Sequence, residues 1–256
     1  MSETDQETVA KTTARRPLGL LPILALHLVP GIVFALVFSA LAKALTARGS
    51  TAYLALILTI PICLVPMELG IMAAWSRRAT GRYSVRDALG YRGGGGVTEW
   101  ILMPIALFFV FVVLSLGTGM LSKWLEGILG PSTPAWLSTE QLVRGIMSVS
   151  SAQRTLTFIL AAVLSGVVAP AVEEAYFRGF LLPKMGSLKG AAPLVNALLF
   201  ALYHFYFPWG VPAVFVIFIP IAYVAWVRRN FLVGTVVHAL INLTGLLQVI
   251  WLTRQG

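Results

Sequence analysis

Three ionisable side chains, Glu173, Glu174 and Arg178, interrupt a stretch of the chain that is otherwise almost wholly apolar. Each charge at the centre of a membrane helix costs about 2.5 to 3.5 kcal/mol on insertion scales, so this group needs pairing, water or a chemical role. On a helix, Glu174 and Arg178 stand at i and i+4, where a carboxylate and a guanidinium can meet. Glu173 points about 100° away and is the carboxylate left over for chemistry. The alternative is that both acids only join a buried ion-pair network.

A second set of polar residues lies on the apolar segments that follow. His204 closes the sequence Phe-Ala-Leu-Tyr-His, and His238 precedes Asn242 by four residues, which puts these two side chains on one helix face. A lone histidine in an apolar helix is most often a hydrogen-bonded core residue, and we expect that role for His27. The joint occurrence of two histidines, an amide and a spare carboxylate instead indicates a functional site.

The depth of these residues is consistent with one shared site. At 1.5 Å per helical residue, Glu173 lies about 15 Å from a basic edge at Lys184, and His238 lies about 14 Å from the arginine pair that precedes it. His204 comes to about 17 Å if Pro193 opens its helix, which is a favoured position for proline. We therefore expect four polar side chains from three helices to share one layer, in the half of the membrane nearer the basic edge.

The three motifs Glu-Glu-x-x-x-Arg, Phe-x-x-x-His and His-x-x-x-Asn follow one another in this order. In order and spacing, the region 156–252 resembles the CAAX-protease and bacteriocin-processing (CPBP) family, which comprises CAAX prenyl protease-like (Abi family) intramembrane endopeptidases. The resemblance implies an all-α bundle with its active site buried in the membrane and open toward the cytoplasm. The candidate site residues are Glu173, Glu174, Arg178, His204, His238 and Asn242.

The resemblance also implies a role for each candidate. Glu173 would be the base that activates a water molecule for peptide hydrolysis, with help from His204. His238 and Asn242 would bind the water or the developing oxyanion, and the remaining Glu-Arg pair would hold the site together. These roles are chemically sound, because imidazole and carboxamide donors stabilise tetrahedral charge where bulk water is excluded.

A divalent metal such as Zn is an open question for this site. Glu173, His204 and His238 are the candidate ligands, and a bound metal would lower the pKa of its water. The chain has no His-Glu-x-x-His motif, and a metal-free glutamate mechanism uses the same residues. The sequence favours metal assistance only slightly.

The composition is that of a polytopic membrane protein. Of the 256 residues, 58% are hydrophobic and 11% are charged, and the mean hydropathy is +0.85, values that a soluble globular domain does not tolerate. The net charge of +9 comes from short loops between apolar spans, so we expect no nucleic-acid partner. We expect the lipid bilayer and a peptide or membrane-protein substrate as partners. The single cysteine, Cys63, offers no disulfide.

The apolar runs predict an all-α transmembrane bundle of about seven membrane helices, with a range of six to eight. The predicted spans are 18–45, 51–75, 101–121, 156–182, 191–207, 211–227 and 231–252. These spans divide the chain into four predicted segments. They are a cytoplasmic tail (1–17), a region of three helices (18–122) that includes a basic loop at 76–100, an outer amphipathic connector (123–154) and a catalytic domain (155–252).

The basic residues predict the orientation. With a cytoplasmic N-terminus, 13 of the 19 Lys and Arg residues lie inside, which fits the positive-inside rule for a bacterial or archaeal cell membrane. The tetraglycine 93–96 lacks both the Gly-Lys-Ser/Thr ending and the preceding strand of a phosphate-binding loop. We interpret it as a flexible connector.

Two other classes of function are alternatives to an endopeptidase. A proton-coupled carrier would use Glu173 and the histidines as a relay, but it would need polar residues along a path, and the first three spans offer little more than His27 and Glu68. A non-proteolytic scaffold or immunity protein is the other alternative. Prenylated C-terminal peptides, bacteriocin leaders and other membrane proteins all remain open as substrates, as does the oligomeric state.

Overall fold

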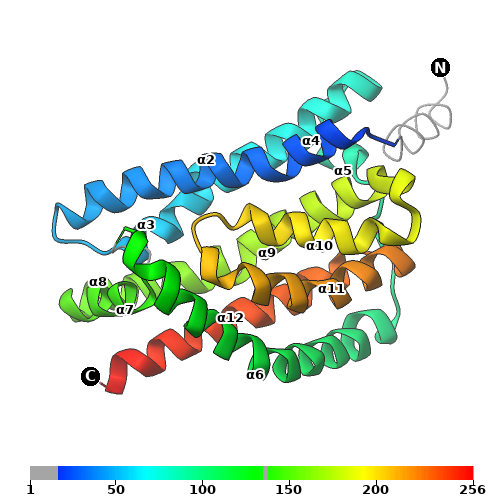
Figure 1. The fold of residues 1–256 in the computed structure, drawn as a ribbon. Helices are drawn as coiled ribbons and strands as arrows, with labels where there is room; N and C mark the ends of the chain where they lie inside the picture. The colour runs from blue at the N-terminus through cyan, green and yellow to red at the C-terminus, as the bar shows by residue number, and fades with distance from the viewer. Residues whose placement is uncertain (1–16, 135–137, 256) are drawn as a thin grey trace.

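The computed structural model describes residues 17–134 and 138–255, and this part of the chain is helical with no strand (Figure 1). The α-helices are α2 (Leu20–Thr46), α3 (Ala52–Thr59), α4 (Val65–Thr80), α5 (Val85–Ala88), α6 (Met103–Leu129), α7 (Thr139–Ser148), α8 (Ser151–Leu160), α9 (Ala169–Glu173), α10 (Ala192–Tyr203), α11 (Val211–Arg228) and α12 (Leu232–Gln255). Wider π-helical turns form η1 (Ile60–Leu64), η2 (Thr98–Leu102), η5 (Ala161–Val168) and η6 (Glu174–Leu181). Tighter 3₁₀ turns form η3 (Gly130–Ser132), η7 (Leu182–Ala191) and η8 (Pro208–Gly210). The predicted all-α helical fold is confirmed.

Six helical stretches in the described part of the chain are long and apolar enough to cross a membrane. This number lies within the predicted range, but the fourth and fifth predicted spans form one 53-residue stretch, Ser151–Tyr203. The chain reverses inside it at Lys189, which has the left-handed φ of 50°. α10 then runs back for 12 residues, about 18 Å, which is shorter than a hydrocarbon core of about 30 Å. The predicted span 191–207 is therefore a half-length helix within the bundle.

The long helices run along a common direction, so the bundle has two ends (Figure 1). We call one of them the basic end; it comprises the end of α4, the segment 81–97, η7 and the junction of α11 with α12. The far end holds the C-termini of α2 and α6 with α7 and α8. In the predicted connector 123–154, α6 continues to Leu129 and α7 is a separate helix. The predicted tail lies outside the described residues except for Pro17. Trp136 and Leu137 of the predicted connector lie outside them as well.

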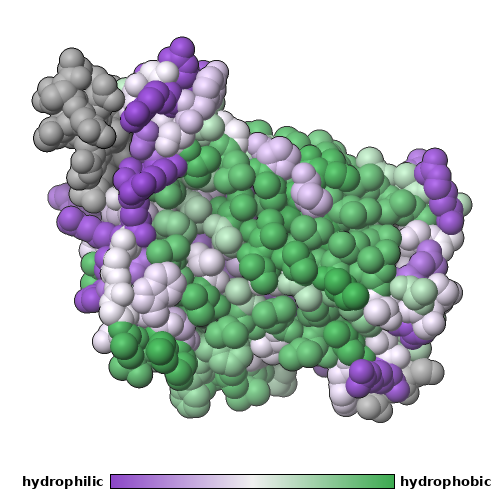
Figure 2. All heavy atoms as spheres, turned by 180° about the vertical axis from the view of Figure 1, so that it is seen from behind, coloured by the Kyte–Doolittle hydropathy of each residue, from purple (hydrophilic) through white to green (hydrophobic). Residues whose placement is uncertain are grey.

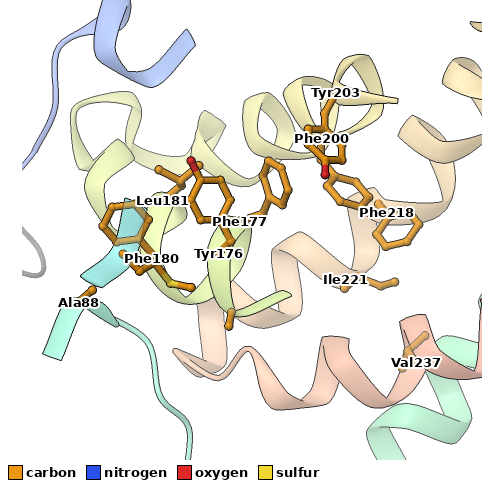
Figure 3. Packing of buried hydrophobic residues seen from close by; sticks show 12 residues of the cluster. Ala88, Tyr176, Phe177, Phe180, Leu181, Phe200, Tyr203, Phe218, Ile221 and Val237 are labelled. Atoms are coloured by element: carbon orange, nitrogen blue, oxygen red, sulfur yellow. The ribbon is translucent and has the colours of Figure 1, made fainter. Parts of the chain in front are cut away.

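An aromatic cluster joins the segments that carry the candidate site residues (Figure 3). Phe177 of η6 packs edge-on against Phe200 of α10, with ring centroids 5.0 Å apart. Phe200 in turn packs against Phe218 of α11 at 4.7 Å. All three rings are buried. Burying each ring contributes about 1.5 to 3 kcal/mol relative to exposure, so η6, α10 and α11 are held in a fixed relative position.

The outer surface carries a broad hydrophobic belt with hydrophilic residues gathered at its ends (Figure 2). α6 is the most exposed of the spans, because only 6% of its most apolar window is buried. Its side chains Ile105, Phe109 and Leu116 are 62%, 68% and 73% exposed. An apolar surface of this extent is stable only against lipid. The chain is therefore an integral membrane protein.

The orientation in the membrane can be tested with cysteine labelling at the two ends. Ser187 in η7 and Ser132 in η3 are both exposed, and they lie at the basic end and the far end. In a Cys63→Ala background and intact cells, we expect Ser132→Cys to react with a membrane-impermeant maleimide and Ser187→Cys to be protected, because basic loops favour the cytoplasm. The reverse labelling pattern would contradict a cytoplasmic N-terminus.

Candidate active site

The Glu174 and Arg178 side chains form an ion pair in the interior of the bundle. Arg178 Nη1 lies 3.1 Å from Glu174 Oε1, and both side chains are fully buried. The carbon of the guanidinium also lies 4.0 Å from the centroid of the Phe200 ring, so the cation stacks on an aromatic face. Neither charge meets water, and each depends on the other for its neutralisation.

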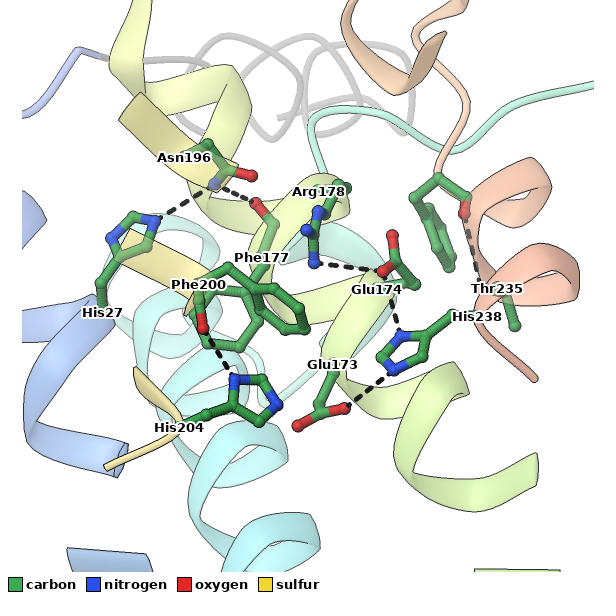
Figure 4. Close-up of polar contacts among 11 residues, drawn as sticks. His27, Glu173, Glu174, Phe177, Arg178, Asn196, Phe200, His204, Thr235 and His238 are labelled. Carbon is green, nitrogen blue, oxygen red and sulfur yellow. Dashed lines mark hydrogen bonds and ion pairs between the residues drawn. The ribbon is translucent and has the colours of Figure 1, made fainter. Parts of the chain in front are cut away.

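His238 of α12 lies between the two adjacent glutamates (Figure 4). Its Nδ1 is 3.2 Å from Glu174 Oε1, and its Nε2 is 3.7 Å from Glu173 Oε2. Because Arg178 pairs with that same Glu174 oxygen, Nδ1 is the nitrogen that donates to it. The contact between Nε2 and Glu173 Oε2 is attractive when one further proton lies either on Nε2 or on the Glu173 carboxyl group. Arg178, Glu174, His238 and Glu173 thus form one continuous chain of contacts.

His204 caps the C-terminus of α10 and has a defined tautomer. Its Nδ1 lies 2.8 Å from the backbone oxygen of Phe200. A carbonyl oxygen can only accept, so Nδ1 carries the proton and Nε2 of the neutral ring is an acceptor. This leaves His204 with a free basic nitrogen on the side of the ring away from its own helix.

Asn242 of α12 is held by the backbone of η5. Its Nδ2 donates to the oxygen of Ser165 at 2.8 Å. Close packing of the two helices makes this contact possible, because a Cβ at Gly166 would lie 2.6 Å from Leu243. The bond fixes the orientation of the carboxamide and leaves its second N–H available to another acceptor.

One cavity joins four of the six candidates. A cavity of about 320 Å³ is lined by Glu173, His204, His238 and Asn242 together with Ser165, Tyr206 and apolar side chains. Its volume suits a short peptide segment with a few polar groups that fix its orientation. The two remaining candidates, Glu174 and Arg178, do not line the cavity. The structure thus separates the side chains that can touch a substrate from the pair behind them.

The cavity extends into the half of the bundle nearer the far end. Its lining includes residues 56–64 of the α3–η1 stretch and 213–218 of α11, which belong to the halves of these helices nearer the far end. The depth count from the sequence used Lys184, which lies in η7 at the basic end, although its side chain is fully buried in the protein and its Nζ donates to the oxygen of Phe180. That the cavity opens toward the cytoplasm stays a prediction.

A third buried carboxylate was not among the predicted site residues. The Tyr203 hydroxyl donates to Glu68 Oε1 at 3.1 Å, and both side chains are fully buried. Tyr203 directly precedes His204, so Glu68 of α4 is linked to the segment that carries His204. The signal in the sequence was an acidic residue within an apolar span, but nothing local indicated its partner.

His27 has the structural role expected for it. Its Nδ1 donates to the oxygen of Ile23 at 2.7 Å, and its Nε2 lies 3.1 Å from Asn196 Nδ2. The same amide nitrogen donates to the oxygen of Phe177 at 3.0 Å (Figure 4). His27 therefore ties α2 to α10 and η6, and it is not among the residues that line the cavity.

The arrangement does not fit the metal site that the sequence suggested. In the described part of the chain, no group of three or more His, Cys, Asp and Glu side chains is placed to hold a metal ion. Nδ1 of His238 is bound to Glu174, and its Nε2 lies 3.7 Å from Glu173 Oε2, so these two candidates contact each other directly. We therefore derive no catalytic step through a metal.

The comparisons with known proteins agree with the motifs. The family described as type II CAAX prenyl endopeptidase Rce1-like matches residues 155–244. A stretch of 80 residues is 32% identical to the UPF0177 protein YxdF of Lactococcus lactis subsp. lactis (strain IL1403), and it covers 31% of this chain and 45% of that protein. The chain thus spans about half the length of this curated relative. No solved structure matches this chain.

The resemblance predicted from the three motifs is confirmed by these matches. The matched region 155–244 contains all six candidate residues, from Glu173 to Asn242. This region is thus similar to the family described as type II CAAX prenyl endopeptidase Rce1-like.

Replacing Arg178 tests the structural role of the ion pair. We expect Arg178→Ala to lower the free energy of unfolding by about 3 to 5 kcal/mol, because Glu174 would remain as an uncompensated buried charge. Thermal and denaturant unfolding in detergent measure the loss. The matched control is Arg144→Ala, since Arg144 pairs with Glu140 at i and i+4 but both are exposed, and its effect should stay below about 1 kcal/mol. An unchanged thermal midpoint in Arg178→Ala together with a loss of cleavage would assign the arginine to the substrate site instead.

Proposed function

We propose that the protein is an intramembrane endopeptidase that hydrolyses a peptide bond of a membrane-associated substrate with water activated by Glu173 and His204. The observation that carries the proposal is the convergence of Glu173, His204, His238 and Asn242 on one cavity. A carrier would instead need polar groups along a path through the bundle. The family match at residues 155–244 supports the same class of reaction.

The reaction begins with a water molecule held between Glu173 and His204. The water donates one hydrogen to the Glu173 carboxylate and the other to Nε2 of His204, which is the acceptor nitrogen because Nδ1 is bound to Phe200. Its lone pair then attacks the carbonyl carbon of the peptide as Glu173 removes a proton. General base catalysis of this kind contributes about 10² to 10⁴ in rate.

The oxyanion that forms needs hydrogen-bond donors in a site that excludes water. The second N–H of Asn242 is available, because its first N–H binds Ser165. His238 supplies a second donor when Nε2 is protonated, and its contact with Glu174 stabilises that positive charge. Donors fixed in this way contribute about 2.7 to 4 kcal/mol each to stabilisation of the transition state.

Collapse of the tetrahedral intermediate breaks the C–N bond. Glu173 returns its proton to the leaving amine, so the carboxylate is regenerated and the two products are a carboxylic acid and an amine. Glu174 and Arg178 take no proton in this sequence. Their task is to hold His238, which contacts Glu174 Oε1, in the orientation that the oxyanion requires.

Two substitutions test the chemistry. We expect Glu173→Gln and His204→Ala each to reduce peptide cleavage by at least about 10²-fold, because each removes a group that acts in the transition state. Mass spectrometry of a peptide library incubated with purified protein in detergent measures the products. The matched control is Glu140→Gln, since Glu140 is exposed on α7 and its loss should leave cleavage unchanged. Cleavage at the native rate in either variant would remove that residue from the mechanism.

Metal removal tests the metal-free form of the mechanism. We expect cleavage to persist after exhaustive dialysis against EDTA and 1,10-phenanthroline, because the proposed steps use only protein side chains and water. Residual metal in the dialysed protein is measured by elemental mass spectrometry. Loss of cleavage that returns on addition of Zn would show that the side chains rearrange around a metal and would contradict this form of the mechanism.

A further inference from the structure

A second hollow lies at the basic end, and the proposed reaction does not use it. It has a volume of about 310 Å³ and is lined by Leu89, Gly90, Arg92, Gly93, Gly94, Arg228 and Arg229. Three of these seven residues are arginines, and none of the seven is acidic. Such a lining attracts an anion.

One acid, Glu99, pairs with an arginine of this hollow and neutralises only part of its charge. Glu99 Oε1 accepts from Arg228 Nε at 2.8 Å and from its Nη2 at 2.5 Å. Glu99 Oε2 accepts from Asn230 at 2.8 Å, so both carboxylate oxygens are engaged. This arrangement fixes Arg228, and it leaves the charges of Arg92 and Arg229 for a ligand.

Gly93 and Gly94 of the tetraglycine line the hollow. Gly93 N donates to the oxygen of Arg229 at 3.1 Å, and Gly93 has a left-handed φ of 70°. A Cβ at this position would lie 2.0 Å from Asn230 Oδ1, so only glycine allows the loop to close against the end of α11. Gly94 has open space around it, which leaves its backbone accessible to a ligand.

The position of the hollow indicates the kind of anion. The membrane span Thr98–Ser132 begins a few residues after Gly94, and its first turns expose Trp100 and Ile101 by 47% and 51%. At this end of the molecule, hydrophilic side chains meet the hydrophobic belt (Figure 2). A ligand that fits both the arginine-lined hollow and the hydrophobic belt has a phosphate group at the level of the arginines and apolar chains beside α6.

We propose that this hollow binds the phosphate of an anionic membrane phospholipid, with Arg92 and Arg229 as its principal cationic contacts. Guanidinium groups bind phosphate oxygens through two parallel N–H donors, and basic pockets at the cytoplasmic surface of membrane proteins recognise anionic headgroups. The site is separate from the cavity that holds Glu173, so the inference does not depend on the endopeptidase proposal.

Native mass spectrometry of the full chain, released from detergent with added phosphatidylglycerol or phosphatidylcholine, tests the site. We expect phosphatidylglycerol to bind more tightly than phosphatidylcholine. In Arg92→Gln and Arg229→Gln its affinity should fall by about fivefold for each arginine replaced. The matched control is Arg78→Gln, since Arg78 is exposed on α4 at the same end but does not line the hollow. A second arm adds inorganic phosphate in place of lipid.

Each outcome decides the proposal. Arginine-dependent binding of phosphatidylglycerol with no comparable binding of inorganic phosphate supports a lipid site. Equal arginine-dependent binding of inorganic phosphate would identify a site for a free anion and overturn the lipid assignment. An equal loss in Arg78→Gln would reduce the effect to surface charge and overturn the site. Thermal midpoints in phosphatidylcholine establish that the variants are folded. If a Gln variant is not folded, the variant Arg92→Lys with Arg229→Lys, which keeps the charge, replaces it in the binding measurement.

Discussion

A single buried oxygen, Oε1 of Glu174, is the point on which the arrangement of the candidate site depends. It pairs with Arg178 on its own helical segment and with Nδ1 of His238 on α12. In a medium of low dielectric constant these contacts are strong, and the loss of either partner is correspondingly costly. One carboxylate thereby sets both the position of α12 against η6 and the direction in which the His238 ring faces Glu173.

The aromatic residues around this carboxylate make its charge tolerable. Phe200 lies against the guanidinium of Arg178, and the same ring contacts His204 and His238 at centroid distances of 4.8 and 5.8 Å. These rings keep bulk water away from the ionised groups, which strengthens every electrostatic interaction within the cluster. Packing and electrostatics are therefore not separable here, because one phenyl ring supports the structural ion pair and both imidazoles.

Sequence reasoning predicted what depends on local spacing and failed where distant segments meet. The separation of four residues placed Glu174 beside Arg178 correctly, because helical geometry fixes that distance. The contact between Tyr203 and Glu68 joins segments 135 residues apart, so no local pattern could reveal it. The burial of Lys184 could not be predicted either, since hydropathy assigns lysine to the surface, while the aromatic ring of Phe180, 4.1 Å from its Nζ, allows its burial.

The change of helix type between the two glutamates has a consequence for how the protein can vary. Glu173 ends α9 and Glu174 begins the wider π-helical turn of η6, and a wider turn accommodates one more residue than an α-helical turn. Loss of one residue from η6 would restore the narrower turn and shift every later side chain around the axis relative to Glu173. Insertions and deletions should therefore be absent from this segment among working homologues and confined to the loops, where changes of length leave the position of Arg178 relative to Glu173 untouched.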